Sequence, residues 1–209
     1  MSASPWHIPA LDLAWSQTAG SHSMGLALPM LVDLLRVRVA VEIGIRFGFT
    51  TEALAKALSL CHGKRGLLIS CDIDPESCAK ADAVTAGLSV RFKSILADSR
   101  TVAWTDILTA YGEKRIDLAY ADGSHEEPFV YADISGLVPL LRPLGAIVVH
   151  DYFPGRPDVM RAVAHFLSDH HGEWNMMVLP EIAGRNSSVA SCILQKRGEG
   201  EMACTVLAD

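Results

Sequence analysis

The chain alternates short apolar runs with longer helix-like stretches, and no other feature of the sequence constrains its fold as strongly. Short runs rich in Val and Ile predict strands that are buried on both faces of a sheet. They are Val39–Ile43, Leu67–Cys71, Val90–Ile95, Ile116–Ala121 and Ala146–Val149. Helical spacing or helix-forming composition predicts helices between and after them, over Thr51–Leu60, Glu76–Ala86, Thr101–Tyr111, Glu126–Leu141 and Pro157–Asp169. Such alternation predicts right-handed βαβ units and a doubly wound, mostly parallel sheet of the α/β class.

Two later apolar runs extend this sheet. Trp174–Leu179 and Val189–Gln195 have no helical pattern between them, and the link Pro180–Ser188 resembles a long hairpin loop. We therefore expect a C-terminal antiparallel strand pair, which gives a seven-stranded, Rossmann-like sheet.

The N-terminal segment predicts helices ahead of the first strand, over Leu11–Thr18 and Met24–Arg36. We expect residues 1–36 to form a helical cap, residues 37–197 the core domain, and residues 198–209 a frayed tail. Asp74 before Pro75 predicts an N-cap followed by proline at the first helical position.

Composition excludes several classes of function. The 209 residues carry 18 basic and 24 acidic side chains, a net charge of −6, which argues against a nucleic-acid-binding surface. No apolar run approaches the roughly 18–20 residues of a membrane span, and the N-terminus has no secretory signal pattern. Five cysteines without a C-x-x-C pair indicate reduced thiols. We expect a cytoplasmic protein with neither nucleic-acid nor membrane partners.

Acidic residues follow all five predicted parallel strands, where open parallel sheets bind ligands. Near the end of the first strand, Glu42 precedes a turn that contains Gly44, Arg46 and Gly48. Because Arg46 stands where G-x-G-x-x-G has its second glycine, a pyrophosphate lacks its usual binding loop. The carboxylate of Glu42 favours a cationic ligand instead.

The next strand ends point to a nucleoside without phosphate. Asp72 can accept hydrogen bonds from the hydroxyls of a ribose, and Asp98 with Ser99 can bind the polar edge of adenine. A ribose, an adenine and a cationic amino-acid part describe S-adenosylmethionine.

The stretch from about Ala19 to Tyr152 resembles class I S-adenosylmethionine-dependent methyltransferases, most of all the small O-methyltransferases typified by catechol and caffeoyl-CoA O-methyltransferases and related natural-product enzymes with D-G-x-H. The matching segments are residues 41–50, 69–75, 117–125 and 140–152. The resemblance implies the following cofactor contacts. Glu42 and Gly44 would line the methionine moiety, Thr50 would meet its carboxylate, and Arg46 and Gly48 would be the other cofactor-binding residues of this turn. Asp72 would hold the ribose, Ile73, Asp98 and Ser99 would contact the adenine, and Asp122 would serve the methionine amine.

The resemblance also implies metal and catalytic roles. Asp122 and Asp151 fall on metal-ligand positions for Mg²⁺ or another divalent cation, whereas Tyr152 replaces the usual third ligand. His125 stands where the family has a lysine near the acceptor hydroxyl. Since an imidazole titrates near neutrality, His125 is the candidate general base, with Asp122 beside it. For His150, a core position at the end of an apolar strand is the favoured interpretation.

Several alternatives stay open at this point. The favoured activity is methyl transfer to a hydroxyl of a small phenolic or natural-product acceptor. Transfer to a small-molecule amine, S-adenosylmethionine binding without catalysis and, less favoured, an NAD-dependent oxidoreductase are the others. Arg156 and Arg185 lie in late loops where they could meet an anionic acceptor, although solvated loop charge is the simpler interpretation. The acceptor is not readable from the sequence, and a homodimer is possible.

Overall fold

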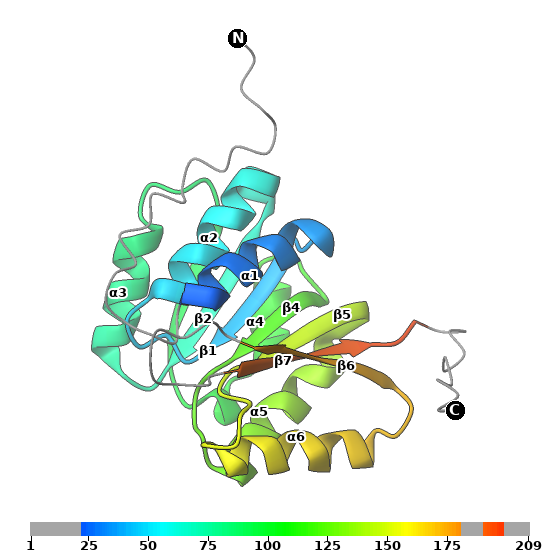
Figure 1. Ribbon diagram of the computed structural model, residues 1–209. Coiled ribbons are helices and arrows are strands. Elements are labelled where there is room, and N and C mark those ends of the chain that lie inside the picture. Colours follow the sequence, from blue (N-terminus) through cyan, green and yellow to red (C-terminus); the bar gives the residue numbers. More distant parts are fainter. Residues whose placement is uncertain (1–21, 181–189, 199–209) are drawn as a thin grey trace.

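A computed structural model describes residues 22–180 and 190–198, which form an α/β/α sandwich around one central sheet (Figure 1). The sheet contains seven strands in the order β3-β2-β1-β4-β5-β7-β6. Their bounds are β1 Val39–Ile43, β2 Leu67–Asp72, β3 Arg91–Leu96, β4 Ile116–Ala121, β5 Leu141–Val149, β6 Trp174–Pro180 and β7 Ala190–Lys196. Strands β1 to β5 pair in parallel, and β7 pairs antiparallel with both β5 and β6. The predicted fold class, with its antiparallel strand pair, is confirmed.

Helices cover both faces of the sheet (Figure 1). They are α1 His22–Leu34, α2 Phe49–His62, α3 Pro75–Thr85, α4 Trp104–Ala110, α5 Glu127–Leu137 and α6 Pro157–Asp169. Short 3-10 turns cover Gly63–Arg65, Ser99–Thr101 and Val138–Leu140. Helix α3 begins as expected, because the Asp74 side chain accepts a hydrogen bond from the amide of Glu76 and Pro75 takes the first turn.

Alternate residues of the strands fill two separate hydrophobic cores. Ala40 of β1 and Leu118 of β4 pack with α1 and α2, whereas Val39 and Val41 of β1 pack with α4, α5 and α6. Because successive side chains of a strand point to opposite faces, a strand apolar at every position can serve both cores. This is why the central strands appear in the sequence as continuous apolar runs.

Some boundaries differ from the expectations. Edge strand β3 is only partly buried, so the expectation of burial on both faces is wrong there. Strand β5 begins at Leu141, five residues before the expected start, and its pairing with β4 is irregular next to Leu144, whose φ is 62°. Helix α4 begins later than expected, at Trp104, because the 3-10 turn Ser99–Thr101 precedes it.

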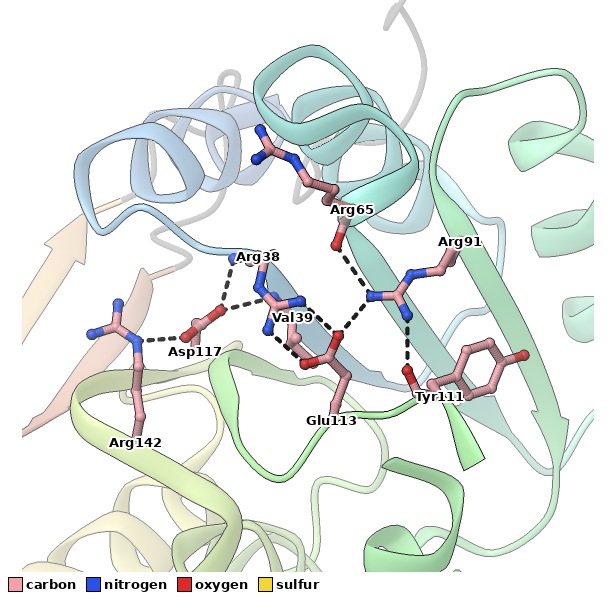
Figure 2. A network of polar contacts seen from close by, with 8 residues as sticks. All are labelled: Arg38, Val39, Arg65, Arg91, Tyr111, Glu113, Asp117 and Arg142. Atoms are coloured by element: carbon pink, nitrogen blue, oxygen red, sulfur yellow. Dashed lines mark hydrogen bonds and ion pairs between the residues drawn. The ribbon is translucent and has the colours of Figure 1, made fainter. Parts of the chain in front are cut away.

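A polar network ties the strands together at their amino ends, opposite the ligand-binding edge of such a sheet (Figure 2). Glu113, which precedes β4, accepts two hydrogen bonds from Arg38 at 2.5 and 2.6 Å and one from Arg91 at 2.7 Å. Arg38 directly precedes β1, and Arg91 is the first residue of β3. One carboxylate therefore joins the starts of β1, β3 and β4.

Asp117 makes a second tie in the same network (Figure 2). Its carboxylate accepts from the amides of Arg38 and Val39 at 2.7 and 2.8 Å and from Nε of Arg142 at 2.5 Å. The start of β1 is thereby fastened to β4 and β5.

Some expectations fall outside the described residues. They are the helix Leu11–Thr18, most of the link 180–188 and nearly all of the tail 198–209. Helix α1, the described part of the expected cap, packs against α2. In the described part of the chain, no helix has the length and hydropathy that crossing a lipid bilayer requires.

Candidate functional site

Backbone hydrogen bonds continue past the carboxyl ends of the strands and hold the following turns side by side. The amides of Ala97, Gly44, Asp122 and His150 donate to the carbonyls of Asp72, Cys71, Ile43 and Ala121, at 2.8 to 3.1 Å. The order of the strands reverses between β1 and β4, the usual place for a ligand in an open parallel sheet.

A cavity of about 1030 Å³ opens at this edge. Most of the site residues expected from the sequence line it, namely Gly44, Arg46, Thr50, Asp72, Ile73, Asp98, Ser99, Asp122, His125 and Asp151. Glu42 and Gly48 are not among the lining residues. The volume is at the upper end of the range for small-molecule sites.

Gly44 is required by the close approach of two turns. Its φ is 87°, and a Cβ at this position would lie 2.1 Å from the carbonyl oxygen of Asp122. Only glycine fits here, so the turn after β1 and the turn after β4 lie against each other. Gly48, with φ of 78°, is the N-cap of α2.

Glu42 lies beneath the cavity, with no exposed surface. Its carboxylate accepts hydrogen bonds from the hydroxyls of Thr50, Thr51 and Ser70, at 2.5, 2.6 and 2.6 Å. Burial raises the pKa of Glu42, and these three donors oppose that rise. The expected place of Glu42 along the methionine moiety stays a prediction, and the carboxylate is engaged within the fold.

Asp72 organises the glycine turn from the end of β2. Its Oδ2 accepts from the amides of Ile45 and Arg46 at 2.8 and 3.1 Å, and its Oδ1 accepts from the amide of Asp74 at 2.9 Å. A carboxylate has about four acceptor positions, so Asp72 keeps capacity for a ribose hydroxyl.

Ile73 and Phe129 give the end of the cavity near β2 and β3 an apolar component. The Ile73 side chain is 75% exposed although it lines the cavity, and Phe129 at the start of α5 lines it as well. The guanidinium of Arg100 lies 4.1 Å from the centre of the Phe129 ring, in cation–π geometry. Sequence reasoning missed Phe129 and Arg100, because no strand-end motif contains them.

Asp98 and Ser99, the expected adenine ligands, are both engaged by neighbours. Asp98 forms an ion pair with Arg100, whose Nε lies 2.8 Å from Oδ1, and this hydrogen bond lowers the pKa of Asp98 to about 2. The Ser99 hydroxyl donates to buried Asp133 at 2.5 Å. Burial raises the pKa of Asp133, and the hydrogen bond from Ser99 opposes that rise. The side chains of Asp98 and Ser99 are thus held in place.

Three potential metal ligands meet after β4 and β5. Nε2 of His125 lies 2.8 Å from Oδ2 of Asp151 and 3.8 Å from Oδ1 of Asp122. One ligand atom from each of the three lies within 4.8 Å of the others. Two carboxylates and an imidazole are a fitting donor set for a divalent cation, and the imidazole favours transition metals such as Mn²⁺ more than Mg²⁺.

His150, for which a core position was the favoured interpretation, is largely buried and also contacts two members of this cluster. Its Nδ1 is 3.2 Å from Oδ1 of Asp122 and 3.5 Å from Oδ1 of Asp151, and its side chain is 11% exposed. The ring thus reaches the site from the end of β5.

Asp151 has a left-handed backbone with φ of 56°, and Arg46 at the opposite turn has φ of 52°. Two non-glycine residues of the cavity wall are therefore held in an uncommon conformation, as is frequent at functional sites. Burial alone would raise the pKa of Asp151, but His125, His150 and Arg156 hold this pKa below its usual value.

Tyr152 is not among the residues that line the cavity. Its ring is partly buried and packs against the core beneath α4, α5 and α6, and its amide donates to the carbonyl of Ala190 at 2.7 Å. Within the described residues, His125 takes the third place in the candidate metal cluster.

Comparison with known proteins gives the family. The model of a methyltransferase domain family matches residues 41–152, which is more than half of the chain and includes both turns that carry Gly44 and Asp122. No curated protein sequence matches the chain.

Solved structures show the same fold. CalS11, a TDP-rhamnose 3'-O-methyltransferase of calicheamicin biosynthesis, has a TM-score of 0.65 at 20% identity, over 92% of this chain and 87% of its own. TomG, an O-methyltransferase of tomaymycin synthesis from Streptomyces achromogenes solved with S-adenosylmethionine, has a TM-score of 0.63 at 19% identity, over 89% and 84%. NodS, an N-methyltransferase from Bradyrhizobium japonicum, has a TM-score of 0.61 at 16% identity, over 84% and 94%.

These neighbours include both an O-methyltransferase and an N-methyltransferase. The structural likeness therefore establishes the fold, and the acceptor atom has to be inferred from the residues of the site. The match to a methyltransferase family argues against the NAD-dependent oxidoreductase alternative. A nucleoside-sized cavity at the β1/β4 reversal, lined by the residues of the matched segment, agrees with it. The chain therefore belongs to the methyltransferase domain family, whose fold is that of S-adenosylmethionine-dependent enzymes.

Proposed function

We propose that this protein transfers the methyl group of S-adenosylmethionine to a hydroxyl of a small molecule, with the help of a divalent cation. The observation that carries the proposal is the cluster of Asp122, His125 and Asp151 on the wall of the cofactor-sized cavity. A hydroxyl acceptor must lose its proton when it attacks, and this cluster combines a proton-accepting imidazole with two cation-binding carboxylates.

The cofactor would occupy the cavity from β3 to β4. S-adenosylmethionine, when bound, supplies an electrophilic methyl group on a sulfonium. We assign the ribose to Asp72, the adenine to Ile73, Phe129 and the Asp98–Ser99 turn, and the methionine end to the turn from Gly44 to Thr50 and to Asp122. Buried Glu42 would act by holding the hydroxyls of Thr50 and Thr51 in place.

The cation would be held by Asp122 and Asp151, with His125 as either its third ligand or the general base. A divalent cation, when bound, would lower the pKa of the acceptor hydroxyl. In the general-base role, the contact of Nε2 with the Asp151 carboxylate would orient the ring, and Nδ1 would be the nitrogen that takes the proton.

Methyl transfer to a panel of catechols and simple phenols, with Mg²⁺, Mn²⁺ or chelator, tests the proposal. Asp122→Asn and His125→Gln should each lower kcat/KM by 100-fold or more, on the order of the contribution of one acid–base group. His165→Gln, on the exposed side of α6, is the matched control and should retain activity. Full activity in both site variants would contradict the proposal.

Calorimetric titration with Mn²⁺ separates the two roles of His125. If His125 is a ligand, His125→Gln should weaken Mn²⁺ binding roughly 10-fold or more. If His125 is the base, Mn²⁺ binding should persist and the lost activity should partly return at alkaline pH, where the acceptor ionises without help.

Two other functions can be tested with the same assays, and three general expectations need measurements of their own. Transfer to a small-molecule amine would appear as methylated amines in a mixed acceptor panel, and calorimetric binding of S-adenosylhomocysteine without turnover on any acceptor would indicate a non-catalytic binding protein. A homodimer, a cytoplasmic location and the lack of nucleic-acid or membrane partners also stay predictions. Light scattering after gel filtration and cell fractionation would test the first two.

A further inference from the structure

We infer that Arg156 selects aromatic acceptors that carry a carboxylate on the same ring as the hydroxyl to be methylated, meta or para to it. This inference rests on the proposed function, because it names the acceptor class of the same site. Arg156 lines the cavity, and its Nε lies 3.7 Å from Oδ2 of Asp151. The same oxygen is 2.8 Å from Nε2 of His125. Arg156 and His125 therefore lie on either side of one oxygen atom. The distance between the two side chains is one that a single aromatic ring can span.

The guanidinium of Arg156 has spare donor capacity. Among the described residues, Asp151 is its one ionic partner, through a contact too long for a hydrogen bond. The side chain is 48% exposed although it lines the cavity. By contrast, Arg100 across the cavity is engaged by Asp98 and stacks on Phe129. Arg156 thus has the planar fork of N–H donors that binds a carboxylate through two parallel hydrogen bonds.

The backbone holds Arg156 in place at this wall. The amide of Arg156 donates to the carbonyl of Phe153 at 2.8 Å, which closes a tight turn. A Cβ on Gly155 would lie 2.4 Å from the Phe153 ring, so glycine allows the turn to close against this ring. Pro157 then fixes the first turn of α6, for which Arg156 is the N-cap. A guanidinium whose backbone is held in this way is better placed to recognise a ligand than one on a long flexible loop.

Local charge agrees with an anionic acceptor. Asp122 and Asp151 would repel a carboxylate if they stood alone. In the proposed function a divalent cation would balance their two negative charges, and the charge of Arg156 would then favour an anionic group at the acceptor end of the cavity. An acceptor with a hydroxyl at the cluster and a carboxylate at Arg156 would meet that preference.

Two probes of the same size test the inference: 3,4-dihydroxybenzoate and 3,4-dihydroxybenzamide. Wild type should prefer the benzoate about 10-fold in kcat/KM, through KM, as one partly exposed charge-assisted contact allows. Arg156→Gln should make kcat/KM about equal for the two compounds by lowering kcat/KM for the benzoate alone. Arg156→Lys should restore part of the preference. Arg161→Gln, five residues further along the chain in α6 and paired with Glu127 and Asp158, is the matched control.

The benzamide separates recognition from chemistry, because damage to the base or the cation site would lower turnover of both compounds equally. Absence of a preference in wild type, or an unchanged preference in Arg156→Gln, would overturn the inference while leaving the proposed function intact. If neither compound is methylated, their calorimetric dissociation constants with S-adenosylhomocysteine present decide the matter. Tighter benzoate binding that depends on Arg156 supports the inference, and equal or absent binding overturns it.

Discussion

Replacing Glu113 by glutamine should destabilise the protein by about 2 kcal/mol while leaving catalysis unchanged. The Glu113 side chain is 8% exposed, and its Oε1 accepts from both Arg38 and Arg91 while Oε2 accepts from Arg38 alone. A glutamine carbonyl can replace Oε1, but its amide group then places N–H donors against the guanidinium of Arg38. One hydrogen bond and the charge attraction are lost.

The magnitude follows from the exposure of the partners. Removing one member of a fully buried ion pair costs about 3–5 kcal/mol, whereas an exposed pair is worth about 0–1 kcal/mol. Arg38 and Arg91 are 46% and 30% exposed, so water can solvate them when the charge of Glu113 is removed. An intermediate cost of about 2 kcal/mol corresponds to a fall in Tm of about 4–8 °C for a chain of this size.

The pH dependence gives a second, independent check. The hydrogen bond from Arg38 holds the pKa of Glu113 below its usual value, although burial opposes this. A lowered folded-state pKa stabilises the protein above the ordinary glutamate pKa of about 4.3, and this stabilisation is lost as the pH falls through the folded-state value. The difference between wild type and Glu113→Gln should therefore be full at pH 7 and shrink towards pH 3.

Urea unfolding followed by circular dichroism measures this difference. Since the network lies at the amino ends of the strands, kcat/KM of the folded variant should stay close to that of wild type. A difference below about 0.5 kcal/mol, the size of an ordinary surface substitution, would refute the reasoning. So would a difference that does not depend on pH.

Three further substitutions test other parts of the structure. Gly44→Ala should abolish S-adenosylhomocysteine binding in calorimetry and lower Tm, because the new methyl group would meet the carbonyl of Asp122 at 2.1 Å; wild-type affinity would contradict this. Asp74→Ala should lower the urea-unfolding midpoint through loss of the α3 N-cap, and an unchanged midpoint would show that the cap is unimportant. Thr51→Val should cost about 1.5–3 kcal/mol, because it removes a donor to the buried carboxylate of Glu42, and Thr51→Ser should recover most of the loss.

The central strands were predictable because burial on both faces makes them continuous apolar runs. The expected bounds of β1 and β4 agree with the structure for this reason. The start of β5 was not predictable, since Arg142, Pro143 and Gly145 interrupt the apolar pattern. That segment is included in the strand through its pairing with β4, which no local pattern encodes.

The site, like the sheet, has a part that was predictable from the sequence and a part that was not. Position at a strand end is a local property, and it brought Asp72, Asp122, His125 and Asp151 to one cavity as expected. Contacts between distant segments are not local. The burial of Glu42 under hydroxyls from α2 and β2, and the arrival of Phe129 from α5, depend on how helices pack on the sheet.

The missing Cβ of Gly44 has a consequence for how the two turns of the cavity can move. Since the backbone after β1 rests directly on the backbone at Asp122, nothing compressible separates the segment that would hold the methyl donor from the one that would activate its target. Neither turn can move toward the other without a backbone clash, so the two sides of the cavity are fixed together at this point.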